Sequence, residues 1–155
     1  MNKSKRWLYV LFTVVLLTGC YNRNTLYHHY EHTCLDGWDK SDTLTFDVPR
    51  ASCRMVVQRE LDLRTTSRYP YRDISVVVEQ TVFPAHYFRR DTLHCNLADA
   101  EGRSEGSGLN LLNYSFRLPD ISLNEGDSLH FSVRHVMRRE ILPGIADVGI
   151  HLSAY

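Results

Sequence analysis

Two segments of the sequence hold residue types at spacings that could do chemistry. Residues 102–106 read GRSEG and match the G-x-S-x-G pattern, in which a serine hydroxyl attacks an ester or amide carbonyl. The nucleophile would be Ser104, which would need a histidine as general base and an acid that orients the histidine. The candidate acids are Asp120 and Asp127, and the candidate bases are His130, His135 and His151.

The second segment, residues 27–34, reads YHHYEHTC and offers metal ligands. His28, His32 and Cys34 fall on one side of a strand, and imidazole and thiolate are good ligands for zinc. A structural zinc site normally has four ligands, and this segment supplies three. We therefore expect no metal, and we interpret the segment as an edge strand with solvated histidines and packed tyrosines.

The elements around Ser104 do not suit a nucleophile. The G-x-S-x-G pattern works where a strand leads into a sharp turn that a helix continues. Here the preceding LADAE is a poor strand, and Gly106 and Gly108 disfavour a helix. The sequence thus predicts a surface loop and no enzyme. It also contains no phosphate loop or dinucleotide motif, so we expect no cofactor and no small-molecule substrate.

The N-terminus has the layout of a secretory signal peptide. MNKSKR supplies three positive charges, and WLYVLFTVVLL follows with eleven almost wholly apolar residues. A membrane-spanning helix needs about 20 residues, so this run is too short to be one. The signal peptide is predicted over residues 1–19.

The end of the signal, LTGC at residues 17–20, resembles the bacterial lipobox. In proteins with that motif the cysteine thiol receives a diacylglyceryl group, the chain is cut before the cysteine, and the new amine is acylated, as with palmitate. Cys20 is therefore the predicted site of lipid attachment, and three acyl chains suffice for stable anchoring. Tyr21 is not the aspartate that retains lipoproteins at the inner membrane, and YNRN lacks an acidic export tag. We expect an outer-membrane protein at the periplasmic face.

The mature chain is long enough for one domain, with residues 20–26 as a tether and residues 27–155 as the domain. Loss of Lys3, Lys5 and Arg6 leaves 15 basic against 18 acidic residues, a net charge of −3, so nucleic acid is not an expected partner. The other cysteines are Cys34, Cys53 and Cys95, of which at most two can pair. Buried free thiols and a single disulfide both fit this number.

Strands separated by turn residues fill the rest of the chain. Apolar residues alternate with polar ones, which is typical of half-buried strands, and Pro, Gly, Asn or Asp bounds each run. Seven or eight such strands without an amphipathic helix predict an all-β fold, a single antiparallel β-sandwich of jelly-roll type. The residues expected to face the core are Leu44, Phe46, Val48, Cys53, Met55, Val57, Leu61, Leu63, Ile74, Val76, Val78, Leu93, Cys95, Leu97, Leu112, Tyr114, Phe116, Leu118, Leu129, Phe131, Val133 and Met137.

Several segments, in this order behind the lipobox, resemble the gliding-motility lipoprotein family GldH of Bacteroidetes. They are WDKSDTLTF (38–46), LDLR (61–64), RYPYRDI (68–74), GRSEGSG (102–108) and VMRREILPGIADVGI (136–150). The resemblance covers essentially the whole mature chain and implies an envelope component needed for gliding and grouped with protein secretion. It brings no catalytic residues. Ser104 stands where a large residue is expected in the family, so the sequence of this loop departs from the family pattern at that position.

The RYPYR segment is the candidate contact site for a partner. Pro70 favours extended geometry at Tyr69, so Tyr69 and Tyr71 are predicted to project to the same side. They form either a recognition platform, with Arg68 and Arg138 beside them, or a rigid entry to a strand whose rings cap the sandwich. The expected partners are the membrane, through Cys20, and other envelope lipoproteins or motility and secretion proteins; a carbohydrate-binding lipoprotein is the alternative.

Overall fold

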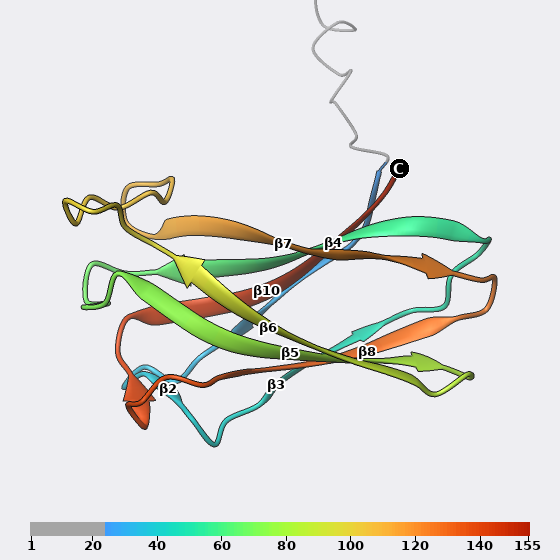
Figure 1. Cartoon of the computed structure of the whole chain (residues 1–155), viewed down its shortest axis with the longest axis horizontal. Helices are drawn as coiled ribbons and strands as arrows, with labels where there is room; N and C mark the ends of the chain where they lie inside the picture. The colour runs from blue at the N-terminus through green and yellow to red at the C-terminus, as the bar shows by residue number, and fades with distance from the viewer. Residues whose placement is uncertain (1–23) are drawn as a thin grey trace, which may run out of the picture.

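Two four-stranded antiparallel sheets face each other in residues 24–155, the part of the chain that this computed structural model describes (Figure 1). One sheet has the order β1 (Thr25–His32), β10 (Ile145–Ala154), β4 (Met55–Thr65), β7 (Leu112–Leu123). The other has the order β3 (Leu44–Val48), β8 (Ser128–His135), β5 (Asp73–Phe83), β6 (Tyr87–Asn96). The two-residue strands β2 (Trp38–Asp39) and β9 (Ile141–Leu142) pair with each other.

The strand order is that of a jelly roll. With the eight long strands numbered along the chain, the sheets run 1-8-3-6 and 2-7-4-5, so every connection between successive long strands crosses to the other sheet except the β5–β6 hairpin. The predicted all-β sandwich is therefore confirmed. No helix that could span a membrane occurs in residues 24–155.

Alternating apolar side chains from both sheets fill the space between them. In β3, for example, Leu44, Phe46 and Val48 are buried while Thr45 and Asp47 are exposed. This is the period of two that the sequence predicts, because successive side chains of a strand point to opposite faces. Most of the predicted core residues are buried or pack against the core.

Three details of the core differ from the expected pattern. Cys53 was expected to face inward, but it is exposed, because β4 begins only at Met55. Arg59 and His135 occupy inward positions and are fully buried. Strand β7 continues past Pro119 to Leu123, with a register shift opposite Val57 and Arg59 in β4 that accommodates the proline.

The first strand begins at Thr25, two residues before the expected start of the domain, because Thr25 pairs with Ser153 of β10. Thr25 and Leu26, which were predicted to belong to the tether, therefore belong to the sandwich. The signal peptide and Cys20 lie outside the described residues.

The sandwich has two distinct ends. At the end where the chain enters, which we call the entry end, lie Asn24, Tyr155 and the short connections 49–54, 84–86 and 124–127. At the opposite end, the loop end, lie the longer connections 66–72, 97–111 and 136–144, together with β2 and β9. The long connection 97–111 stands out from the sheets at the left of Figure 1.

Candidate functional site

The loop end gathers the segments that the sequence marked as contact candidates. The β4–β5 connection packs on the turn between β9 and β10, where the Thr66 amide donates to the Gly144 carbonyl at 2.8 Å. Gly144 has a positive φ of 83°, and a Cβ there would lie 2.3 Å from the Tyr69 nitrogen. Only glycine fits this approach of the two backbones, so Gly144 positions the RYPYR segment.

Tyr69 and Tyr71 pack against each other rather than forming a flat platform. Their ring centroids are 5.5 Å apart with the planes at 76°, an edge-to-face contact. The Tyr69 hydroxyl donates to the Asp73 carbonyl at 2.8 Å. The pKa of Tyr69 lies far above its ordinary value, mainly because the side chain is buried and to a lesser extent because the Asp73 carboxylate is near. Tyr69 is therefore a fixed part of the strand entry.

Clefts lie on both sides of Tyr71. One, of about 390 Å³, is lined by three tyrosines, Tyr69, Tyr71 and Tyr114, and by Ser104. The other, of about 360 Å³, has Tyr71, Met137 and Arg138 in its wall. The structure thus brings Tyr71 and Arg138 together across one cleft, although they are far apart in the sequence.

Unpaired arginines lie at the loop end, and two of them, Arg138 and Arg139, line the second cleft. Arg68, Arg138 and Arg139 are exposed and form no ion pair with any residue of 24–155. The neighbouring acids Asp99 and Glu101 already pair with Arg103, at 2.8 and 3.5 Å. Three guanidinium groups are therefore available for carboxylates or backbone carbonyls of another molecule.

Ser104 lies in the loop-end connection and has no base beside it in residues 24–155. Its Oγ is 2.6 Å from the Tyr114 hydroxyl and accepts from the Gly106 amide at 3.1 Å. The residues considered as its partners all have other contacts: Asp120 with Arg117 and Tyr155, Asp127 with the Asn124 amide, His130 with Asp47, His135 with the Trp38 carbonyl, and His151 with Glu60. The G-x-S-x-G letters thus mark a loop between two strands.

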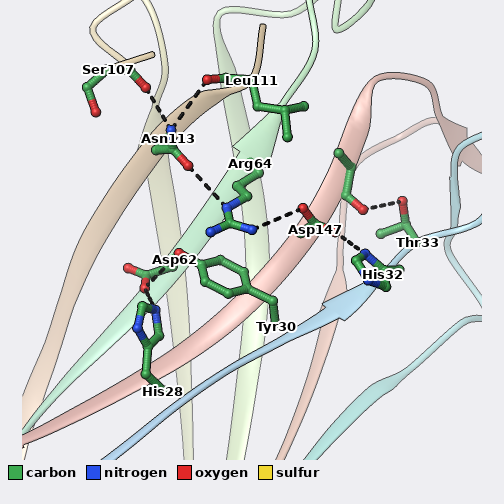
Figure 2. Close-up of polar contacts among 11 residues, drawn as sticks. His28, Tyr30, His32, Thr33, Asp62, Arg64, Ser107, Leu111, Asn113 and Asp147 are labelled. Carbon is green, nitrogen blue, oxygen red and sulfur yellow. Dashed lines mark hydrogen bonds and ion pairs between the residues drawn. The ribbon is translucent and has the colours of Figure 1, made fainter. Parts of the chain in front are cut away.

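His28 and His32 of β1 belong to a polar network on the outer face of the first sheet (Figure 2). His28 donates to the Asp62 carboxylate at 2.9 Å, and the Tyr30 hydroxyl donates to the same oxygen at 3.3 Å. His32 bonds Asp147, whereas Cys34 lies beyond the strand and does not join the two histidines. No group of three or more possible metal ligands occurs in residues 24–155.

Arg64 joins the two halves of this network. Its guanidinium lies 3.7 Å from the centroid of the Tyr30 ring, pairs with Asp147 at 3.6 Å and donates to Asn113 at 3.1 Å. Asp147 is nearly buried, and such a carboxylate needs charged or hydrogen-bonding partners. The network therefore ties edge strand β1 to β10, β4 and β7.

The cysteines within residues 24–155 are all free. Cys34 is exposed at the loop end, Cys53 is exposed at the entry end, and Cys95 is buried between the sheets. Burial raises the pKa of the Cys95 thiol to about 12. The sequence left open buried free thiols or a single disulfide. Free thiols are found, but only the Cys95 thiol is buried.

The segments that carry the family resemblance meet in space. Trp38 pairs with Leu142, the RYPYR turn lies on Gly144, and Arg64 of LDLR pairs with Asp147. Comparison of the sequence with known families matches residues 25–152 to the GldH lipoprotein family. The chain belongs to the GldH lipoprotein family. The resemblance seen in the sequence is thereby confirmed, and with it the assignment as a lipoprotein.

Comparison with curated proteins finds no match. Solved structures with a related shape include a family GH115 4-O-methyl-α-glucuronidase with specificity for decorated arabinogalactans, at 15% identity and a TM-score of 0.46, covering 85% of this chain and 18% of that chain. An aminopeptidase from the marine sediment archaeon Thaumarchaeota archaeon has 13% identity and a TM-score of 0.39, with 73% and 24% covered. Eiger TNF from S. frugiperda has 14% identity and a TM-score of 0.33, with 86% and 94% covered. The chain thus spans less than a quarter of the length of the first two.

Proposed function

We propose that the protein is an outer-membrane lipoprotein, anchored by lipid on Cys20 at the periplasmic face, that serves the gliding-motility and secretion machinery by binding another envelope protein. It acts by holding its partner in place, not by turnover. The partner contacts the loop end, and Tyr71, Arg68 and Arg138 are the residues that bind it.

One observation carries this proposal: the loop end is opposite the end where the chain enters the domain, and it carries three arginines that form no ion pair within residues 24–155, two of which, Arg138 and Arg139, line an apolar cleft. A lipid-anchored domain with this layout presents its longest loops away from its anchor. Exposed arginine beside half-buried tyrosine rings is typical of protein contact sites, where arginine and tyrosine are enriched. Membership in a gliding-type lipoprotein family supports an envelope partner.

The test is affinity capture of the tagged, lipidated protein, compared with a variant carrying Tyr71→Ser and Arg138→Glu. We expect the variant to lose its partner, with a reduction of tenfold or more, while remaining folded. Arg90→Glu serves as the control, because Arg90 is an exposed arginine of β6 that pairs with Glu79 away from the loop end. Equal recovery of the same proteins by the wild type and the Tyr71/Arg138 variant would rule out this contact site.

Carbohydrate binding is the second candidate, because three tyrosines line one of the clefts. Aromatic faces stack on sugars, but here Tyr69 and Tyr71 are packed edge to face and only half exposed. A glycan array with the purified domain separates the two candidates. Binding that is lost with Tyr114→Ala and retained with Arg138→Glu would favour the sugar.

The absence of turnover has its own test. Ser104→Ala removes the only nucleophile of the G-x-S-x-G segment, and we expect it to restore motility or secretion fully in a deletion strain. Cys20→Ser, in contrast, should fail to restore them and should incorporate no labelled fatty acid. A Ser104→Ala protein that is folded and abundant yet inactive would overturn the binding role.

A further inference from the structure

The entry end carries most of the exposed apolar side chains. Nine large hydrophobic residues are exposed in residues 24–155, and six of them lie at or next to this end. They are Leu26, Val56, Phe83, Tyr87, Phe88 and Tyr155. Isolated exposed apolar residues are ordinary, but their gathering at one end of a molecule marks an interaction surface.

The β5–β6 hairpin is the core of this surface. Phe83, Tyr87 and Phe88 flank a three-residue turn, with exposed fractions of 37, 55 and 54%. The Phe83 ring packs edge-on against His86, with centroids 4.9 Å apart. All three rings are carried by paired strand residues: Tyr87 lies opposite Val82, Phe88 lies opposite Thr81, and Phe83 lies opposite Ser128 of β8. The hairpin therefore presents preformed aromatic rings at its tip, with Tyr87 and Phe88 on opposite faces of the strand.

The chain entry links this tip to a bilayer. Four residues lie between Cys20 and Thr25, and the five Cα–Cα steps that join these two positions span at most about 18 Å. The entry end itself is about four strands wide, or on the order of 15 Å. A lipid on Cys20 thus allows the entry end to reach the membrane surface.

The charges at the entry end are mixed. The β3–β4 connection contributes Arg50 and Arg54 and no acid, whereas the β7–β8 connection contributes Glu125 and Asp127. The Asp127 carboxylate accepts from the Asn124 amide at 2.9 Å. Aromatic side chains favour the interface between headgroups and acyl chains, so the apolar rings, and not a net charge, make this end suited to a lipid surface.

We propose that the entry end is a membrane-docking surface. The rings of the β5–β6 hairpin enter the headgroup region of the bilayer that holds the Cys20 lipid, and the domain stands on the membrane with its loop end pointing away. The inference rests on the proposed lipid anchor. Weak insertion suffices, because a domain already held by lipid meets the surface at a high effective concentration.

Tryptophan fluorescence in proteoliposomes tests the orientation. The lipidated protein is placed in vesicles of phosphatidylethanolamine and phosphatidylglycerol that contain acyl-brominated lipid. Ala85→Trp puts a reporter at the hairpin tip, and Leu109→Trp puts one at the loop end; the native Trp38 is buried and common to both. We expect bromine to quench the Ala85→Trp emission by at least twofold and to leave the Leu109→Trp emission unchanged.

A second variant tests the rings themselves. Tyr87→Ser combined with Phe88→Ser should remove most of the quenching at Ala85→Trp, whereas Leu35→Ser at the loop end should not, and thermal unfolding shows that each protein is folded. Negligible quenching at Ala85→Trp, or equal quenching at both reporters, in protein that floats with the vesicles would overturn the docking surface. Protein that neither floats nor carries acyl chains by mass spectrometry would instead overturn the anchor.

Discussion

At the scale of single residues, the buried guanidinium of Arg59 is the least expected feature. It lies between the sheets with no exposed surface and donates to the Pro119 carbonyl at 2.7 Å, to the Gln80 amide oxygen and to Asp91 at 3.4 Å. Gln80 is itself buried, and its Nε2 has no partner in residues 24–155. Removing one member of such a buried charged network strongly destabilises the fold, because the remaining members lose their hydrogen-bond or ionic partner.

Arg59→Met is expected to destabilise the domain by about 3 kcal/mol, because it leaves the Gln80 oxygen and the Pro119 carbonyl without their donor and Asp91 with one cation fewer. Urea unfolding measures the difference. Arg90→Met is the matched control: its ion pair with Glu79 is exposed, and its loss should cost less than about 1 kcal/mol. Similar losses for both variants would mean that the buried contacts add nothing to stability.

His135 predicts a dependence of stability on pH. Burial lowers its pKa below the ordinary value of about 6.5. As the pH falls below that value, the unfolded chain gains a proton that the folded chain does not bind, so the free energy of unfolding falls by up to about 1.4 kcal/mol per pH unit. His135→Gln removes this titration, and its amide can still donate to the Trp38 carbonyl. Urea unfolding at pH 7.5, 6.0 and 5.0 should show a shallower decline for the variant, and parallel declines would exclude His135 as the cause.

Part of this residue-scale information was present in the sequence. Position 59 has the parity of Val57 and Leu61, and position 135 has that of Phe131 and Val133, so alternation alone places both side chains inward. Alternation does not supply the partners, because Pro119 and Gln80 come from other strands. The pairing of Arg64 with Asp147 was hidden for the same reason: it depends on which strands are neighbours.

At the scale of elements, a glycine decides how the RYPYR segment sits on the sandwich. Gly144→Ala is expected to cost more than 2 kcal/mol and to weaken partner capture, because its Cβ would meet the backbone of Arg68 and Tyr69 as well as adopt an unfavourable φ. Gly126→Ala is the control, since Gly126 has a positive φ of 87° with nothing within 4 Å of the added Cβ. It should cost about 1 kcal/mol and leave capture intact.

Equal thermal stability of the Gly144→Ala and Gly126→Ala proteins would show that the backbone of the β4–β5 connection can shift to accommodate a Cβ at position 144 at little cost in free energy. In that case the position of Tyr71 would be set by its own loop and not by the turn beneath it.

The strands themselves were predictable, because each is specified by its own alternation and its own turn residues. The two-residue strands β2 and β9 were not, since two residues carry no periodicity and their pairing joins positions about one hundred residues apart. The proximity of Tyr71 and Arg138 was not predictable either, because it depends on which strands are neighbours in the sheets, and alternation within one strand does not specify that.

At the scale of the whole molecule, the three thiols of residues 24–155 lie in three different parts of the sandwich: Cys34 at the loop end, Cys53 at the entry end and Cys95 in the core. In detergent, a membrane-impermeant maleimide should label Cys34 and Cys53 rapidly. Cys95 should react at least about a thousandfold more slowly, because its exposure requires global unfolding and its thiolate is suppressed. Mass spectrometry of peptides over time measures all three rates.

On vesicles the same labelling should slow at Cys53 by several fold and remain unchanged at Cys34, if the entry end rests on the bilayer. Rapid labelling of Cys95 in detergent would contradict the packed core. Unchanged labelling of Cys53 on vesicles would contradict the orientation.

The two ends of the described chain meet at one point, where the Ala154 amide donates to the Asn24 carbonyl at 2.7 Å. Chain ends this close allow circular permutation: a short linker can join them, and new termini can be opened in the connection 97–111. A lipobox placed before those new termini would leave the fold intact while moving the anchor to the opposite pole. An inverted protein of this kind would keep every residue of the native domain but would have its loop end, and not its entry end, beside the lipid. It would therefore test whether the proposed partner binding depends on the orientation of the domain.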